Sequence, residues 1–185
     1  MSAEIDPLDL SRRDGLPDAL RVLLEDLPRE TWEAHPNFGG MVQFWLQRHL
    51  MFRRLLDVLE TDLQRLIDRQ VGFETYGGRL SHYGGTLLNE LHAHHQIEDQ
   101  HYFPRLVTLD TRLEQGFALL DRDHHAMDGA INGVADGANT LLRSKGADIA
   151  ALEVVLRDMA RMLDRHLTDE EEIIVPVILK TGFDG

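Results

Sequence analysis

The sequence predicts an all-α protein, an up-down-up-down four-helix bundle with an N-terminal arm. Four long segments repeat apolar residues at spacings of three and four, which is the pattern of amphipathic helices. Short connections separate these segments, so consecutive helices should lie antiparallel beside one another. No segment shows the sustained alternation of apolar and polar residues typical of a β-strand. We place the arm at residues 1–40 and the bundle at residues 41–182.

The arm is irregular in composition, because four prolines and three glycines fall within residues 1–40. Pro17 stands where proline favours the first turn of a helix, and leucines follow it at helical spacing. We therefore expect a short helix over residues 17–27, packed on the bundle through its apolar face.

The four helices of the bundle follow in order, each with a continuous apolar face. Glycine-rich or serine-containing stretches mark the connections between them. The stretch 72–85 is predicted to be a loop, which weakens the start of the second helix. The predicted helices span residues 41–71, 79–109, 111–143 and 148–179.

Composition excludes several classes of function. Lys and Arg number 19 and Asp and Glu 32, which gives a net charge of −13 over 185 residues. Such an acidic chain is a poor partner for nucleic acids or anionic membrane surfaces. The absence of cysteine excludes disulfides, thiolate zinc sites, iron–sulfur clusters and cysteine nucleophiles. No apolar run is long enough for a membrane span or a secretory signal, so we expect a cytoplasmic protein.

A repeated motif carries the chemistry of the chain. The second predicted helix contains His94 and Glu98, and the fourth contains His166 and Glu170. Both stretches read H-x-x-x-E-[DE]-x-x-x-[FV]-P, and the second copy lies 72 residues after the first. The chain therefore reads as two copies of one helical hairpin.

The helix before each motif adds one histidine, His49 in the first and His124 in the third. Residues i and i+4 share a helix face, so each histidine of the motif points the same way as its glutamate. Imidazoles and carboxylates are ligands for iron, manganese or zinc, and two carboxylates able to bridge favour a dinuclear centre. A cation would also offset the cost of burying carboxylates on apolar faces. The predicted metal ligands are His49, His94, Glu98, His124, His166 and Glu170.

This arrangement, H…HxxxE…H…HxxxE on four helices with a proline six residues after each glutamate, resembles the hemerythrin-like (HHE cation-binding) family. The resemblance covers about residues 40–180. It implies a four-helix bundle that holds a non-haem diiron centre, with two iron ions per chain bridged by carboxylates. Members of the family carry or sense oxygen, respond to redox or nitric oxide stress, or handle iron.

Some neighbouring residues remain alternative ligands. His101 lies three residues after Glu98 on the same predicted face, as a fifth ligand or a hydrogen-bond donor to the ligands. Oxygen-carrying members of the family place the last carboxylate five residues after the last histidine, which would be Glu171 here. Glu170 fits the internal repeat better, and we prefer it.

Other histidines are expected to stay outside the centre. The adjacent His124 and His125 cannot both point inward, and His125 is expected to be exposed or beside the ligands. His82, His92 and His95 are expected at the surface or around the ligands. Oxygen-carrying hemerythrins use five histidines, and only four are evident, which argues against reversible oxygen carriage.

We therefore expect a non-haem diiron protein that binds or senses oxygen, nitric oxide or peroxide, or handles iron. A ligand-binding protein is favoured over an enzyme. The alternatives are a diiron oxidase or peroxidase, and a scaffold bundle whose metal is purely structural.

Overall fold

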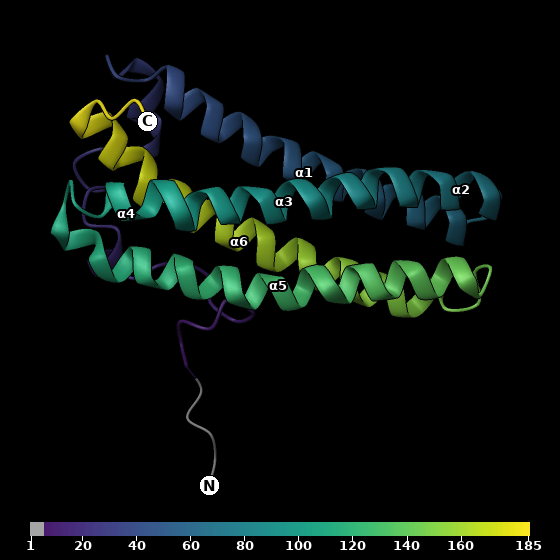
Figure 1. Cartoon of the computed structure of the whole chain (residues 1–185). Helices are drawn as coiled ribbons and strands as arrows, with labels where there is room; N and C mark the ends of the chain where they lie inside the picture. Colours follow the sequence, from purple (N-terminus) through teal and green to yellow (C-terminus); the bar gives the residue numbers. More distant parts are fainter. Residues whose placement is uncertain (1–5) are drawn as a thin grey trace, which may run out of the picture.

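The computed structural model describes residues 6–185, whose long helices lie side by side in an elongated bundle (Figure 1). All regular structure in this part of the chain is helical, which confirms the all-α class. The up-down-up-down order stays a prediction, and residues 1–5 of the predicted arm lie outside the described residues. The α-helices are α1 (Gly40–Ile67), α2 (Phe73–Arg79), α3 (Gly85–Ile97), α4 (Phe103–Leu106), α5 (Glu114–Arg143) and α6 (Ile149–Thr181).

The second long stretch is helical from α2 to α4, with two π-helical turns inside it. The turn η3 (Leu80–Gly84) joins α2 to α3, and the turn η4 (Glu98–Tyr102) joins α3 to α4. The predicted loop over residues 72–85 is therefore wrong. Tyr76 and Leu80 are buried there, at 1% and 2% exposure, and their packing outweighs the helix cost of glycine, about 1 kcal/mol per residue.

Two other helix boundaries differ from the prediction. The first helix ends at Ile67 rather than near residue 71, and Arg69 follows with a φ of 59°. The short helix expected over residues 17–27 is only a 3-10 turn, η1 (Asp18–Leu20), followed by turns. Isolated helices of this length are marginal, and here the leucines are instead buried by the fold of the arm over the bundle.

The apolar core consists of two clusters at different heights in the bundle. The arm-side cluster contains Trp45, Phe103, Leu120 and Ile173, together with Leu16, Leu20, Leu23 and Trp32 of the arm. The loop-side cluster contains Phe52, Leu91, Met127, Leu163 and, from the arm, Leu10. Each long helical stretch contributes to both clusters, so both ends of the bundle are held by apolar packing.

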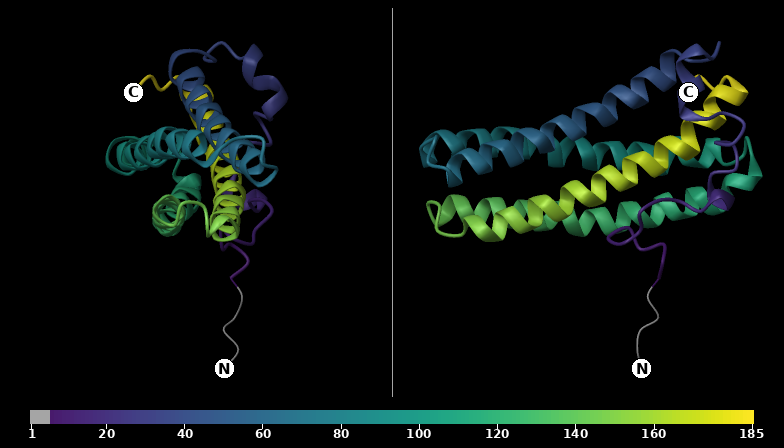
Figure 2. Two further views of the ribbon diagram at one scale, coloured as in Figure 1. Left: turned by 90° about the vertical axis from the view of Figure 1, so that its right-hand side faces the viewer. Right: turned by 180° about the vertical axis from the view of Figure 1, so that it is seen from behind.

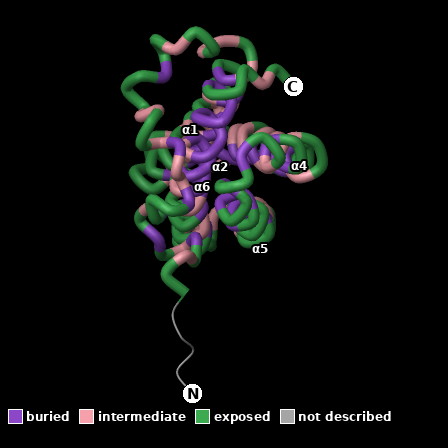
Figure 3. Tube along the Cα trace, turned by 90° about the vertical axis from the view of Figure 1, so that its left-hand side faces the viewer, coloured by how far each residue is buried: buried purple, intermediate pink, exposed green. Residues whose placement is uncertain are grey.

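Helix α6 packs against both α5 and α1, and the arm folds over the end of the bundle that carries the C-terminus (Figure 2). Viewed toward that end, the buried positions of α1, α5 and α6 face one another and the exposed positions lie outside (Figure 3). Among residues 6–185, no helix is both long enough and apolar enough to cross a membrane.

Candidate metal centre

A layer of buried polar side chains separates the two apolar clusters. In α1, His49 lies between Trp45 of one cluster and Phe52 of the other, and in α5 His124 lies between Leu120 and Met127. In the other two long helical stretches, polar residues likewise separate the residues of one cluster from those of the other. We call this set the polar layer: His49, His94, His95, Glu98, His124, His166 and Glu170, all less than 9% exposed.

One half of the polar layer groups two histidines with two glutamates. His49, His94, Glu98 and Glu170 each offer a ligand atom within 4.8 Å of the others. His94 Nε2 lies 3.0 Å from Glu98 Oε1, and His49 Nε2 lies 3.4 Å from Glu170 Oε1. We call this the two-histidine group.

The other half groups three histidines. His95, His124 and His166 also offer ligand atoms within 4.8 Å of one another. His124 Nε2 lies 3.5 Å from Glu98 Oε2, and His166 Nε2 lies 3.5 Å from Glu170 Oε2. We call this the three-histidine group. Each glutamate thus turns one oxygen toward each group, which is the placement that a carboxylate bridging two metal ions requires.

The donor set fits metal ions, because many of its atoms have no other partner. Within residues 6–185, both oxygens of Glu98, both ring nitrogens of His95 and the Nε2 atoms of His124 and His166 are buried without a hydrogen bond. Buried polar atoms are ordinarily satisfied, and each one left unpaired costs about 1–3 kcal/mol. A cluster of such atoms from four helical segments, α3, η4, α5 and α6, is accounted for by cations between them.

Burial also sets the protonation states that metal binding needs. It lowers the pKa of His94 and of His95 well below the ordinary histidine value, so both rings are neutral near pH 7 and present a lone pair. Burial and the nearby Glu170 carboxylate raise the pKa of Glu98 well above its ordinary value. A metal ion would take the place of the proton that Glu98 holds.

Carboxylates lie on the far side of three of the imidazoles, within hydrogen-bond distance for His124 and His49, whereas His166 Nδ1 has no hydrogen bond in residues 6–185. His124 Nδ1 lies 2.6 Å from Asp99 Oδ1, His49 Nδ1 lies 3.0 Å from Glu171 Oε1, and His166 Nδ1 lies 3.6 Å from Asp123 Oδ2. A carboxylate at Nδ1 fixes the tautomer whose Nε2 is free for a metal, and raises its basicity. In each case Nε2 faces the glutamates of the polar layer.

The structure brings all six predicted ligands together and adds His95. His95 was expected at the surface or around the ligands, and this prediction is wrong. A helix in a bundle packs against two neighbouring helices, so two adjacent residues can both be buried, each against a different neighbour. Successive residues are about 100° apart, so His94 faces α1 while His95 stacks on His124 of α5, with ring centroids 4.1 Å apart. The signal available in the sequence was the contrast with α6, where the residue after His166 is a leucine.

The alternative ligands lie outside both groups. His101 is exposed, because the π-helical turn η4 inserts one extra residue and brings Phe103 inward in its place. His125 is exposed and its Nδ1 contacts the carbonyl oxygen of Asp121. Glu171 orients His49 and is bound by Arg53 at 2.8 Å. Burial alone would raise the pKa of Glu171, but hydrogen bonds from His49 and Arg53 lower it to about 2.

A comparison with protein families matches residues 40–178 to the hemerythrin HHE cation-binding domain. The chain belongs to the hemerythrin HHE cation-binding family. The buried histidines and glutamates of this hemerythrin-like protein lie within the residues that match the cation-binding domain. Comparisons with curated proteins and with solved structures found no similar protein.

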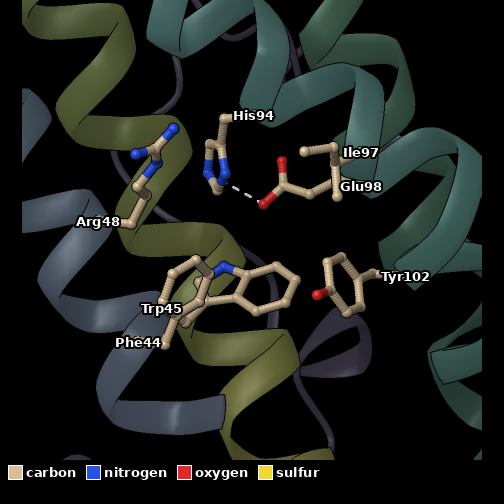
Figure 4. A pocket seen from close by; sticks show the side chains of 7 residues that line it. All are labelled: Phe44, Trp45, Arg48, His94, Ile97, Glu98 and Tyr102. Atoms are coloured by element: carbon tan, nitrogen blue, oxygen red, sulfur yellow. Dashed lines mark ion pairs between the residues drawn. The ribbon is translucent and has the colours of Figure 1, made fainter. Parts of the chain in front are cut away.

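A pocket of about 170 Å³ opens from the surface to the two-histidine group. Figure 4 shows His94 and Glu98 on one side of it, the Trp45 and Tyr102 rings on the opposite side and Arg48 beside His94. Phe44 and Ile97 line the same pocket and are 58% and 48% exposed, so the route begins in solvent. The indole N–H of Trp45 donates to Glu170 Oε1, which ties the pocket wall to the centre.

Proposed function

We propose that this hemerythrin-like protein binds two iron ions and, at one of them, a small ligand such as oxygen, nitric oxide or peroxide. The two-histidine group would hold one ion and the three-histidine group the other, with Glu98 and Glu170 shared between them. The observation that supports two ions is the position of these glutamates, each of which faces both groups. Iron suits a set of imidazoles and carboxylates without thiolates.

The small ligand is proposed to reach the ion of the two-histidine group. With both glutamates shared, that ion would have two histidines where the other would have three, and the pocket in Figure 4 is lined by His94 and Glu98 of the two-histidine group. When bound, a pair of iron ions supplies electrons and an open coordination position to a small ligand. The rings of Trp45 and Tyr102, 5.0 Å apart, give the pocket an apolar wall that limits the entry of water.

With His95 in the polar layer, five histidines lie beside two glutamates. The argument against reversible oxygen carriage rested on a count of four histidines, and the proposed centre has five. A cytoplasmic location and the absence of nucleic-acid and membrane partners remain part of the proposal, supported by the net charge of −13.

The test is elemental analysis of protein purified without a metal-affinity tag, with optical spectra before and after addition of azide. Two iron ions per chain and ferric bands that shift with azide are expected. The adjacent histidines of α5 supply a matched pair: His124→Gln should lose metal, and the exposed His125→Gln should not. Zinc in place of iron, or a spectrum indifferent to azide, would instead identify a structural metal. Sustained consumption of oxygen or peroxide with a reductant would identify an oxidase or peroxidase.

A further inference from the structure

We infer that the N-terminal arm is part of the metal centre, because its arginines hold the carboxylates that orient two of the histidines. Arg13 would position His166 through Asp123, and Arg29 would position His49 through Glu171. This inference rests on the proposed metal binding and extends it to residues that lie before the family match at residues 40–178.

Arg13 is buried beside the helices at the height of the polar layer. The arm contributes Leu10 to the loop-side cluster and Leu16 to the arm-side cluster, so Arg13 falls between the two clusters as the polar residues of the helices do. Its side chain is only 1% exposed. The arm thus follows the same order of apolar, polar and apolar positions as the helices that carry the histidines.

The guanidinium of Arg13 is shared between two buried carboxylates. Its Nε donates to Asp169 Oδ2 at 2.8 Å, and its Nη1 and Nη2 donate to the two oxygens of Asp123, the former at 2.9 Å. Asp123 Oδ2 is the atom that faces His166 Nδ1. Because the guanidinium of Arg13 binds both oxygens of Asp123, it fixes the plane of that carboxylate. The orientation of Asp123 Oδ2 relative to the His166 ring is fixed as a result.

Stability alone does not account for this arrangement. A buried charge pair is on balance no more stabilising than apolar residues of similar volume, so its presence is weak evidence of a stabilising role. The position of Asp123 at the Nδ1 edge of a candidate ligand points to orientation of that ligand. Asp169 has a second cation in Arg165, at 2.5 Å, whereas Arg13 is the guanidinium that engages Asp123 in residues 6–185.

Arg29 makes the corresponding contact with the two-histidine group, but less exclusively. Its Nη1 lies 2.7 Å from Glu171 Oε2, and Glu171 Oε1 lies 3.0 Å from His49 Nδ1. Arg53 of α1 binds the same carboxylate, and the Arg29 side chain is 46% exposed. Loss of Arg29 should therefore disturb the centre less than loss of Arg13.

The test compares Arg13→Gln with Arg21→Gln in the full chain. Arg21 also joins the arm to α6, 2.7 Å from Glu172, but this carboxylate contacts no imidazole in residues 6–185. Ferrous iron is titrated anaerobically against a chelator of known affinity, and the midpoint potential is followed through the optical bands. Arg13→Gln should bind one of the two ions roughly 10- to 100-fold more weakly and shift the potential, because orienting partners of metal histidines have effects of that size.

Arg21→Gln should leave affinity and potential close to those of the unmodified chain. Arg13→Lys should recover part of the affinity, because lysine keeps the charge but cannot bind both carboxylate oxygens as the guanidinium does. If Arg13→Gln does not fold, Arg13→Lys is compared with Arg21→Gln instead. The inference would be overturned if all three variants had the iron affinity and midpoint potential of the unmodified chain, or if Arg13→Gln and Arg21→Gln lost the same amount of affinity. Neither result would count against the proposed metal site. An unmodified chain that binds no iron would overturn the proposed function itself, and the inference with it.

Discussion

At the scale of single residues, the ring of His95 has the clearest chemical consequence. Its neutral imidazole is 3% exposed and lies against His124 and His166. We predict that His95→Gln loses the ion of the three-histidine group and keeps the other, so that iron content falls by one ion per chain. Elemental analysis after dialysis measures this. His101→Gln is the control, because His101 is an exposed histidine of the same helical stretch, and its metal content should not change.

The ligands of the polar layer could be predicted only in part from sequence. Four of them stand out because the H-x-x-x-E motif is repeated 72 residues later, and His49 and His124 because each lies on the apolar face of the helix before a motif. His95 has no counterpart in the second copy, where Leu167 occupies the same position and is fully buried. The break in the repeat marks His95 as different but does not give its position, because which of two adjacent rings faces which neighbouring helix depends on packing between helices.

A second residue, Asp110, joins the connection before α5 to the end of α6. Its carboxylate binds Arg112 Nη2 at 2.6 Å and Lys180 Nζ at 2.9 Å. The hydrogen bond from Arg112, followed by that from Lys180, lowers the pKa of Asp110 below its ordinary value. A carboxylate with a lowered folded-state pKa stabilises the protein above its unfolded pKa and loses this contribution as the pH falls.

We therefore predict that Asp110→Asn lowers the free energy of unfolding by about 1 kcal/mol at pH 7, and by less as the pH falls below about 4. Urea unfolding at several pH values measures the difference. The exposed Asp136→Asn should show no such loss at pH 7. A deficit for Asp110→Asn that stays constant down to low pH would contradict the ion-pair explanation.

At the scale of elements, α5 touches the arm through a glycine. A Cβ added at Gly116 would lie 2.8 Å from the carbonyl oxygen of Leu20 and 3.0 Å from Ile173 Cδ1. Gly116→Ala should destabilise the protein by about 1–3 kcal/mol because backbone has to move, although alanine favours helix.

The matched control is Gly129→Ala in the same helix, where an added Cβ meets nothing within 4 Å. It should stabilise the protein by roughly 0.5–1 kcal/mol through helix propensity alone. Urea midpoints compare the two, and limited proteolysis before residue 40 reports whether the arm has loosened in Gly116→Ala. Equal effects of both substitutions would show that the arm does not press on α5.

The π-helical turns explain why the inward-facing residues were harder to predict than the presence of the long helices. Apolar spacing of three and four predicted the long helices correctly, because that spacing follows from regular α-helical geometry. The turn η4 adds one residue, so the inward position after Glu98 is Phe103 and His101 moves to the surface. Glycines over residues 72–85 suggested a loop, and only the burial of Tyr76 and Leu80 against other helices overrides them.

At the scale of the whole molecule, the two apolar clusters lie on either side of the polar layer. Removing iron would leave both clusters in place and would restore the unpaired carboxylates and imidazoles between them. We predict that the metal-free protein remains helical by circular dichroism but is less stable. Iron held at about 1,000 times its dissociation constant should add about 4 kcal/mol to the free energy of unfolding. A metal-free chain with no helical signal, or one as stable as the loaded protein, would contradict this.

The unequal number of histidines in the two groups would also distinguish the two proposed ions from each other. A symmetric duplication would give two interchangeable positions, and a chain supplied with a single equivalent of metal would be a mixture of two isomers. With His95 on one side only, the positions differ in donor number and in access from solvent. Half-loaded protein would then be one species, and a different metal could be placed at the second position to give a defined heterometallic pair.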